Sequence, residues 1–478
     1  MKTIRFKPNF FVALLLLGLV IFSIFSGKFI AETSSKLLIA VILGFLFSIL
    51  ILVNTDAALI LLIFSMLLSP EMGMGQVPGR EVVIRVDDIL LAIITFTWLA
   101  KTAVNKGLAL FIKTPLNKAI SLYIMVCVVS TLRGAVVGYV NPTSGFFYVL
   151  RYIEYFLLFI LVANHIHSKK QIKYFLTAFF ITCAVVSVYG IMQIPSGIRV
   201  SAPFEGEIGE PNTFGGYLLF ILCIASGIVL QKVSKRIKFA LIGMGVLSFI
   251  PFLFTLSRAS YLAIIFSFVT FIILSRKKLE LTAVVLAVIL IGLIFVPEAI
   301  FSRVKYTFQQ RESRLVRLGD TYLDPSASAR IISWKESFQA WKKTPIMGRG
   351  VAGYFFVDGQ YVRNLVETGI IGLSSFLWLF WLIFKHSHKI FREREDELYK
   401  GICLGFIAGF VGLSIHALTA NTFIIIRIME PFWFMAGIVM MLPALEKQEV
   451  SSYGDDLGDE ETEEKKKQGI RLKGHFPV

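Results

Sequence analysis

ARIISWKESFQAWKKTPIMGRGVAGYFFVDGQYVRNLVETGIIGL, the stretch from Ala329 to Leu373, ends the one long polar segment that separates two sets of very apolar segments. In its first part, large apolar residues recur at helical spacing while basic residues fill other positions, which predicts an amphipathic helix that ends before Pro345. The residues on its apolar face are Ile331, Trp334, Phe338 and Trp341. We therefore expect basic groups held at the edge of a membrane.

A glycine-rich loop follows this helix and leads back into the membrane. It matches the GxGxxG pattern of dinucleotide-binding loops through Gly348, Gly350 and Gly353. No strand is predicted before the pattern, so we interpret the glycines as a tight turn. The chain then enters an apolar run at about Leu365, with Arg363 and Glu367 at its mouth.

Composition places the chain among polytopic membrane proteins. Of 478 residues, 56% are hydrophobic and 17% are charged, and the mean hydropathy is +0.74. A soluble core does not need so much apolar surface. The formal net charge of +16 lies mostly in the connections between apolar segments, so it bears on orientation in the membrane and does not indicate nucleic acid as a partner.

The predicted fold is all-α, with about 12–14 helices that cross ~30 Å of hydrocarbon. Candidate spans lie at 9–26, 36–53, 56–70, 85–101, 117–137, 146–164, 171–193, 212–230, 237–254, 259–275, 280–296, 362–384, 400–418 and 422–444. The span at 56–70 is short and is open to a re-entrant interpretation. We divide the chain into N-terminal spans 1–209, a core 210–385, C-terminal spans 386–446 and a disordered cytoplasmic tail 447–478.

Charge in the connections predicts the orientation. Lys and Arg concentrate in alternate connections, which are expected on the cytoplasmic side, so both termini are predicted to be cytoplasmic. The long loop 297–361 then lies outside the cytoplasm, together with 71–84, 138–145 and 194–211. This loop is expected to contain amphipathic helices. The first apolar run has no small-residue cleavage site and is interpreted as a retained anchor.

Ionisable residues in the spans are candidates for function because charge is costly inside a membrane. Arg151 with Glu154, and Arg427 with Glu430, are three residues apart, so mutual pairing on a helix and a functional role are both open for them. Arg258 begins a predicted span beside Ser257 and has no acidic residue near it in the sequence. An arginine at that place suits a phosphate, whose oxygens it can bind in bidentate fashion.

Histidine and cysteine positions narrow the chemistry further. His416 is the one histidine expected in the outer half of the membrane, where a packing role and a proton-accepting role both remain open. The four cysteines, Cys127, Cys183, Cys223 and Cys403, all fall in predicted spans. No disulfide, no metal site and no cofactor is therefore expected.

Four stretches in order, EPNTFGGYLLFIL, TLSRASYLAI, RIISWKESFQAWKKTPIMGRGVAGYF and DGQYVRNLVETGIIGL, resemble the O-antigen ligase and polymerase superfamily of bacterial membrane glycosyltransferases. The resemblance is strongest from about Glu210 to Leu373. It implies a multi-pass protein of the bacterial inner membrane. It also implies a metal-independent, inverting glycosyltransferase that acts on undecaprenyl-diphosphate-linked oligosaccharides on the extracytoplasmic face.

The resemblance assigns roles to particular residues. Arg258 matches the arginine after a serine at the start of a span, and Arg330 matches the arginine before the loop tryptophan, both suited to the donor diphosphate. The loop scaffold and the re-entry motif are matched by Trp334, Pro345, Gly348, Gly350, Tyr361, Glu367, Gly369 and Gly372. Ligases that transfer to lipid A core or to protein usually have His-Asn three residues before the tyrosine, where this chain has Asp358-Gly359. This departure favours a polysaccharide polymerase, with Asp358 as a replacement base.

The reaction itself sets requirements that the residues can meet. The departing diphosphate needs cations, and the sequence shows no Asp/His metal cluster, so arginines are assigned that role. The acceptor hydroxyl needs at most a modest base. The catalytic candidates are Asp358, Glu367 and His416. The substrate-binding candidates are Arg258, Arg330, Arg363, Glu210 and Tyr361.

Other functions remain open at this point. A ligase that moves the glycan to a lipid or protein acceptor fits the same motifs. A flippase or transporter of lipid-linked oligosaccharide also fits many spans with buried charge, although no internal repeat is visible. A non-catalytic subunit of an export assembly is a third class. Expected partners are the lipid bilayer, the lipid-linked donor, a glycan or lipid acceptor, and polysaccharide export or chain-length proteins.

Overall fold

The computed structural model describes residues 54–77, 80–104, 112–205, 209–275, 317–318, 321–322 and 325–448. The chain divides into two compact units, Met1–Ala58 and Leu59–Val478. Of the first unit the structure describes residues 54–58, which begin helix α3 (Thr55–Leu68). The predicted spans 9–26, 36–53 and 280–296, and the tail beyond residue 448, lie outside the described residues.

Within the described part of the chain, eight helices are long and apolar enough to cross a membrane, which confirms a mainly helical polytopic membrane protein. They are α5 (Asn117–Val137), α6 (Pro142–His165), α7 (Lys169–Gln193, continued by the short η1, Ile194–Ser196), α8 (Pro211–Val229), α9 (Lys235–Phe254), α14 (Gln360–Glu393), α15 (Glu397–His416) and the helix Ile426–Gln448. Shorter apolar helices are α3 and α10 (Arg258–Leu274). Helix α4 (Val86–Val104) follows the predicted span 85–101 closely.

Helix α15 lies at the centre of the bundle and packs against both α8 and α10. Close approach to α8 depends on small residues, because a Cβ on Gly227 would lie 2.4 Å from the Gly401 carbonyl oxygen and from the Gly405 nitrogen. The glycines Gly401, Gly405 and Gly409 recur every fourth residue on this face of α15. Such small-residue spacing lets two membrane helices pack backbone to backbone.

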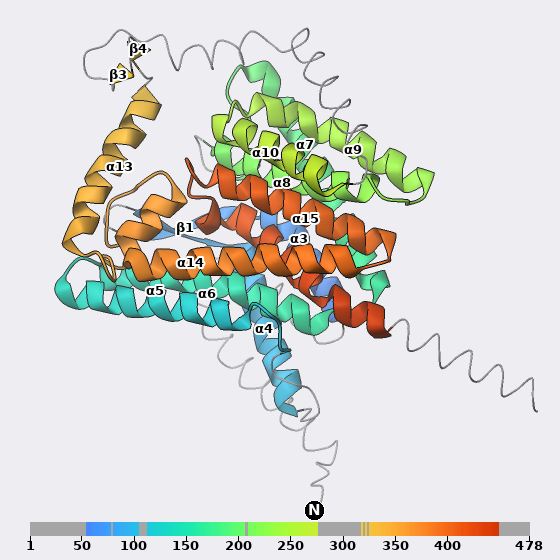
Figure 1. Cartoon of the computed structure of the whole chain (residues 1–478), viewed down its shortest axis with the longest axis horizontal. Coiled ribbons are helices and arrows are strands. Elements are labelled where there is room, and N and C mark those ends of the chain that lie inside the picture. Colours follow the sequence, from blue (N-terminus) through green and yellow to red (C-terminus); the bar gives the residue numbers. More distant parts are fainter. Residues whose placement is uncertain are drawn as a thin grey trace, which may run out of the picture. The chain divides into compact units, whose positions relative to one another are not determined.

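Successive helices run in opposite directions, so one end of the bundle gathers the first residues of α6, α8, α10 and α14 (Figure 1). We call this the α13 end, because the amphipathic helix α13 (Pro325–Lys343) lies there, steeply inclined to α14 (Figure 1). Helix α13 confirms the predicted helix before Pro345, and Ile331 and Phe338 of its predicted apolar face are exposed. At the opposite end the connections are tied by ion pairs of Lys169 with Asp396 and of Arg394 with Glu446.

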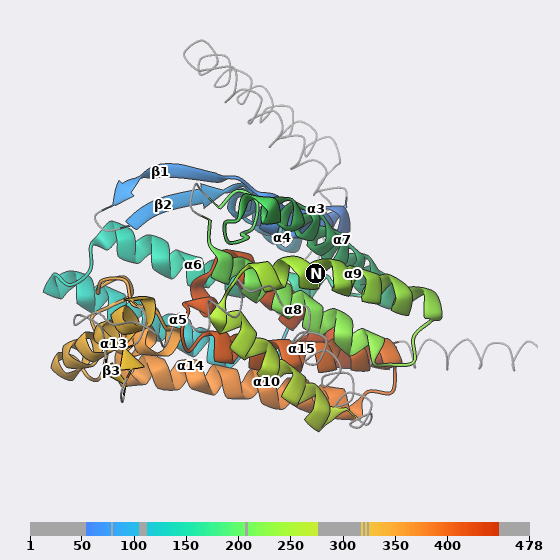
Figure 2. The same cartoon turned by 90° about the horizontal axis from the view of Figure 1, so that it is seen from above.

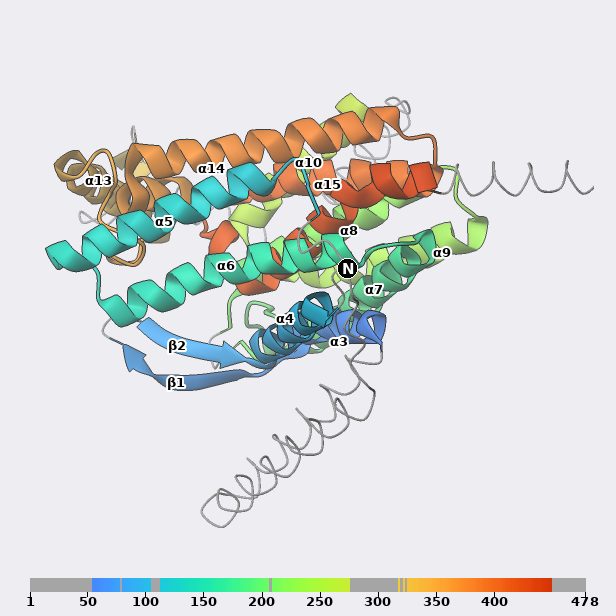
Figure 3. The ribbon, with the colours of Figure 1, turned by 90° about the horizontal axis from the view of Figure 1, so that it is seen from below.

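The connection 71–84 differs from the plain loop that the sequence predicts. Strands β1 (Glu71–Val77) and β2 (Arg80–Arg85) form an antiparallel hairpin in which Glu71 is opposite Arg85. A register shift between Gly73 and Gln76 marks a bulge. Figures 2 and 3 show the hairpin extending from α3 and α4 toward the α13 end. The pieces β3 (Arg317–Leu318) and β4 (Thr321–Tyr322) are two residues each.

Helix α14 bends where the chain re-enters the bundle. Gly369 has a non-helical conformation, with φ 67° and ψ −167°, so two helical segments meet there. The loop 344–353 occupies the bend, since Arg349 N–H donates to the Val366 carbonyl and Gly350 N–H donates to the Glu367 carbonyl. The Ile370 N–H donates to the Pro345 carbonyl. The predicted tight turn is therefore the part that satisfies the backbone groups freed by the bend.

We predict that Gly348→Ala strongly destabilises the fold. Gly348 has φ 66°, and a Cβ there would lie 2.5 Å from the carbonyl carbon and oxygen of Glu367. Backbone strain alone costs about 1–3 kcal/mol, and the clash adds to it. The measurement is the thermal unfolding midpoint, Tm, of the protein in detergent.

Gly243→Ala is the matched control. Nothing lies within 4 Å of a Cβ at Gly243, which is inside helix α9. Alanine should stabilise that helix by about 0.5–1 kcal/mol. Equal Tm values for the two variants would contradict the role assigned to the Gly348 turn.

Candidate functional site

Helix α13 is fastened to the turn 357–360 that begins α14. Arg330 Nε lies 3.2 Å from Asp358 Oδ2, and the Trp334 indole N–H donates to the Asp358 carbonyl. Gly359 has φ 106°, and a Cβ there would lie 3.2 Å from Trp334 Nε1. The Arg330 side chain is 21% exposed and the Asp358 side chain is 36% exposed, so this ion pair remains open to solvent. Two of the predicted site residues are thus brought together by a tertiary contact.

The same turn is tied to the end of α15 and the segment after it. Gln360 N–H donates to the carbonyls of Ala417 and Ala420, and Asn421 Nδ2 donates to the Val357 carbonyl. The Gln360 side-chain oxygen accepts from the N–H of Phe423, in the short helix η2 (Thr422–Ile424). Arg330, Asp358 and the C-terminal end of α15 therefore form one region.

His416, the last residue of α15, is fully buried in this region. Its Nδ1 lies 2.7 Å from the Thr422 hydroxyl oxygen, which orients the ring. Its Nε2 is buried and has no hydrogen-bond partner among the described residues. A Cβ on Gly216 would lie 3.6 Å from His416 Cε1, so α8 packs against the imidazole.

Asn212 joins the first turns of α8 and α10. The Ser257 hydroxyl donates to Asn212 Oδ1 at 2.8 Å, and Ser257 is the N-cap of α10, whose first residue is Arg258. Glu210 is the N-cap residue of α8; it is exposed, and its carboxylate accepts a hydrogen bond from the Thr213 hydroxyl. The N-termini of two long helices thus meet beside Arg258. Helix N-termini carry partial positive charge and favour anions, phosphates in particular.

Arg363 and Glu367 lie elsewhere and hold the fold together. Arg363 Nε is 3.2 Å from Glu367 Oε1, and both side chains are almost fully buried. Glu367 Oε1 also accepts from the N–H of Ala352, and the Arg363 guanidinium lies over the ring of Tyr148. Both residues therefore anchor the loop 344–353 against the bundle, on the side of α14 that faces α5 and α6.

Tyr361 also has a partner within the bundle. Its phenol hydroxyl donates to the Ser414 carbonyl at 2.8 Å, and its ring contacts Phe376 and Phe380. This arrangement fixes the first turn of α14 to α15. The structure thus brings Arg330 and Asp358 together and ties their turn to the end of α15, where His416 lies. It joins the first turns of α8 and α10 through Asn212 and keeps Arg363, Glu367 and Tyr361 within the packed bundle.

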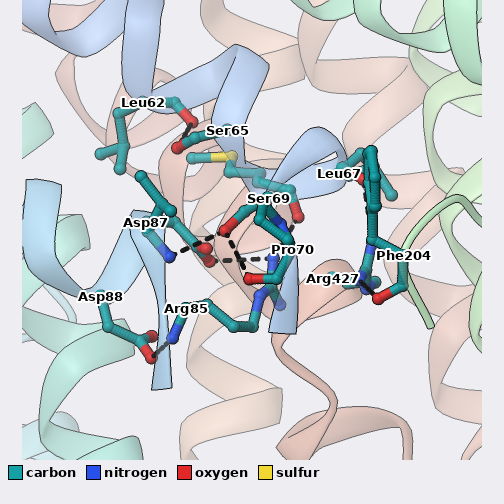
Figure 4. A network of polar contacts seen from close by, with 12 residues as sticks. Leu62, Ser65, Leu67, Ser69, Pro70, Arg85, Asp87, Asp88, Phe204 and Arg427 are labelled. Carbon is teal, nitrogen blue, oxygen red and sulfur yellow. Dashed lines mark hydrogen bonds and ion pairs between the residues drawn. The ribbon is translucent and has the colours of Figure 1, made fainter. Parts of the chain in front are cut away.

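Arg427 and Arg151, each three residues before a glutamate, have partners other than that glutamate. Arg427 donates to the carbonyls of Leu67, Pro203 and Phe204, and its Nε lies 3.6 Å from Glu205 Oε1 (Figure 4). Arg427 therefore closes the loop before α8 onto the bundle, and Glu430 faces Asp87. Arg151 lies 3.8 Å from Glu154 but closer, 3.2 Å, to Asp88.

Asn212 and Thr422 are residues that the sequence analysis did not select. For Asn212, the available signal was a polar side chain at the start of a predicted span, in the stretch EPNT. For Thr422, it was a threonine just before the last helix. Neither pattern reveals its partner, because Asn212 and Ser257 are 45 residues apart in the chain.

Comparison with known families finds a match for part of the chain. Residues 243–377 match the family model described as O-antigen ligase. This match confirms the resemblance to the O-antigen ligase and polymerase superfamily, and it spans Arg258, Arg330 and Asp358. The match supports membrane glycan processing of the O-antigen ligase or polymerase type. A search of curated proteins found no matching relative.

Burial raises the pKa of the Glu205 carboxyl to about 8, and the Arg427 guanidinium opposes this rise. The folded chain therefore keeps a proton on Glu205 that the unfolded chain releases near its ordinary pKa of 4.5. Because the folded state binds more protons in this interval, the contribution of Glu205 to the free energy of unfolding falls as pH rises from about 4.5 to about 8.

We predict that Glu205→Gln removes this pH dependence. The difference in Tm, variant minus wild type, should rise as the pH of a detergent solution increases from about 5 to about 8.5. Glu336→Gln, at an exposed position of α13, is the control and should show a constant difference. A constant difference for Glu205→Gln as well would contradict the assignment.

Proposed function

We propose that this protein is a surface-polysaccharide polymerase of the bacterial inner membrane, with its site on the extracytoplasmic face at the α13 end. It would transfer a glycan from an undecaprenyl diphosphate donor to a hydroxyl of an acceptor glycan, with inversion at the transferred sugar. The observation that carries the proposal is the partly exposed Arg330–Asp358 pair, to which the N-termini of α8 and α10, joined through Asn212 and Ser257, add a second positive feature.

Donor binding follows from the positive charge of this region. A polyprenyl diphosphate keeps its tail in the bilayer and presents its phosphates at the membrane edge, where α8 and α10 begin. Arg258 and Arg330 supply two guanidiniums, and the two helix N-termini add backbone N–H groups. As the glycosidic bond to the diphosphate breaks, these groups stabilise the charge that develops on the leaving phosphate without a metal ion.

Asp358 is the base in this proposal. Glu367 is buried and bonded to Arg363 and Ala352, so its carboxylate is engaged away from the site. His416 is fully buried, which suits an orienting role better than contact with a bulky acceptor glycan. The Asp358 carboxylate is partly exposed and can reach an acceptor hydroxyl.

The ion pair makes the base dependent on the donor. While Arg330 lies against Asp358, the guanidinium occupies a carboxylate oxygen that an acceptor hydroxyl would otherwise reach. A diphosphate competes for the same guanidinium, because it carries more negative charge than one carboxylate. Donor binding thus draws Arg330 away and frees the Asp358 carboxylate only when a donor sugar is present for the acceptor hydroxyl to attack.

The first test compares Arg330→Ala with Lys335→Ala, an exposed position on the same helix. Glycans from cells with equal protein levels are separated by size, and the leaflet that holds lipid-linked units is determined. Arg330→Ala should reduce long polymer by ~100-fold or more and leave single lipid-linked units on the outer leaflet. Lys335→Ala should leave the polymer unchanged.

Other outcomes of this test identify the alternatives. Units that accumulate on the inner leaflet would replace the proposal with a flippase. Normal polymer on the lipid carrier that fails to reach a lipid or protein acceptor would indicate a ligase. Unchanged polymer in Arg330→Ala would remove the enzyme assignment for this region.

A second prediction concerns the base. Asp358→Asn keeps the size and shape of the side chain but removes the proton acceptor, so polymerisation should fall by ~10²–10⁴-fold while donor binding persists. Trp334→Phe removes the hydrogen bond to the Asp358 carbonyl and part of the ring but leaves the carboxylate in place, and it is the structural control. A larger loss in His416→Gln than in Asp358→Asn would move the base to His416.

A further inference from the structure

A second group of charged residues lies where three distant segments meet. Arg85, Asp87 and Asp88 stand at the junction of β2 and α4 (Figure 4). Helix α6 contributes Arg151 and Glu154, and the helix Ile426–Gln448 contributes Glu430. None of these residues belongs to the candidate site, and the proposed function uses none of them.

The two arginines of this group are already engaged. Arg85 Nη2 lies 2.9 Å from Asp87 Oδ2 and donates to the Met66 carbonyl. Arg151 Nη1 lies 3.2 Å from Asp88 Oδ1 and 3.8 Å from Glu154 Oε2. Four carboxylates thus stand against two guanidiniums, which leaves an excess of two negative charges in a buried place.

Glu430 carries the excess. Its side chain is fully buried, and neither carboxylate oxygen has a hydrogen-bond partner among the described residues. Asp87 is also fully buried, and its carboxylate oxygens have no hydrogen-bond donor there either, although Arg85 lies beside it. A buried carboxylate without a partner costs several kcal/mol. Either bound protons or a cation between these groups must therefore offset their negative charge.

The geometry suits one small ion. One carboxylate oxygen each from Asp87, Asp88 and Glu430 lies within 4.8 Å of the other two. Three ligands at 2.1–2.4 Å from a common centre, the distances typical of Mg²⁺ and Ca²⁺, fall within such a spread. Asp87 and Asp88 are in the first turn of α4, which holds their carboxylates side by side at one helix end.

We propose that Asp87, Asp88 and Glu430 bind a divalent cation that prefers oxygen ligands, such as Mg²⁺, Mn²⁺ or Ca²⁺. The set contains only carboxylates, which selects hard cations and disfavours Zn²⁺ or Cu⁺. Two positive charges cancel the excess of the group. The ion would tie α4 to the helix Ile426–Gln448, which follows η2. Thr422 of η2 orients His416, so the role of the ion would be to hold these elements in register.

The test measures bound metal and stability in the full-length protein purified in detergent. Metal content is determined by mass spectrometry after washing, and Tm is recorded with EDTA and then with added MgCl₂, MnCl₂ or CaCl₂. The proposal requires about one divalent ion per chain, a Tm that falls by several degrees in EDTA, and recovery that increases with metal concentration.

Variants assign the effect to the site. Glu430→Gln should lose both the bound ion and the response to EDTA, whereas Glu336→Gln, an exposed control on α13, should keep both. If Glu430→Gln does not fold, Asp88→Asn at the half-buried position provides the same comparison. Wild-type protein without bound divalent metal, with a Tm that EDTA and added metal leave unchanged, would overturn the proposal and show that protons neutralise these carboxylates.

Discussion

Two backbone hydrogen bonds, from Arg349 N–H to the Val366 carbonyl and from Gly350 N–H to the Glu367 carbonyl, connect the outer loop to the bend in α14. A membrane helix that bends must find new partners for its freed carbonyls, because the hydrocarbon supplies none. The loop supplies these partners only if its backbone comes very close, which the positive φ of Gly348 and Gly350 allows. The turn with Asp358 lies between this junction and the end of α15, to which Gln360 and Asn421 also tie it.

The charged residues of the bundle fall into two groups by what they contact. Arg363 with Glu367, and Arg427 with Glu205, are buried pairs that join loops to helices. Arg330 with Asp358 is partly exposed and joins α13 to the turn that begins α14. The first kind fixes geometry, since removing one partner would leave a buried charge uncompensated. The second kind can exchange its partner for a ligand, which is what a binding site requires.

The segment from His416 to Glu430 links the two regions for which a function is proposed. It begins at the imidazole held by Thr422 and passes through η2, which bonds to Gln360 at the start of α14. It ends at the carboxylate that faces Asp87. A cation at that carboxylate would therefore stabilise the helix Ile426–Gln448. It would support the position of His416 from the other end of this segment.

Much of the helical scaffold was predictable from the sequence. The span 117–137 agrees with α5 at both ends, and α8, α9 and α10 begin within two residues of their predicted starts. Long apolar runs determine helices in a bilayer because no other backbone structure satisfies its own polar groups there. The hairpin of β1 and β2 was not predicted, since its residues show no clear alternation of apolar and polar positions.

The sequence by itself determined the membrane class, the amphipathic helix α13, the family resemblance and the importance of Arg330, because each depends on local composition or on a contiguous motif. Only the tertiary structure decided that Glu367 pairs with Arg363 inside the bundle, that Asn212 joins α8 to α10, and that Glu430 faces Asp87. The last two contacts join residues that are far apart in the sequence. The first distinguishes Asp358 from Glu367 as a candidate base, although the two are equally acidic in the sequence. Helical spacing shows which residues share a face of one helix, but it carries no information about which other helix that face meets.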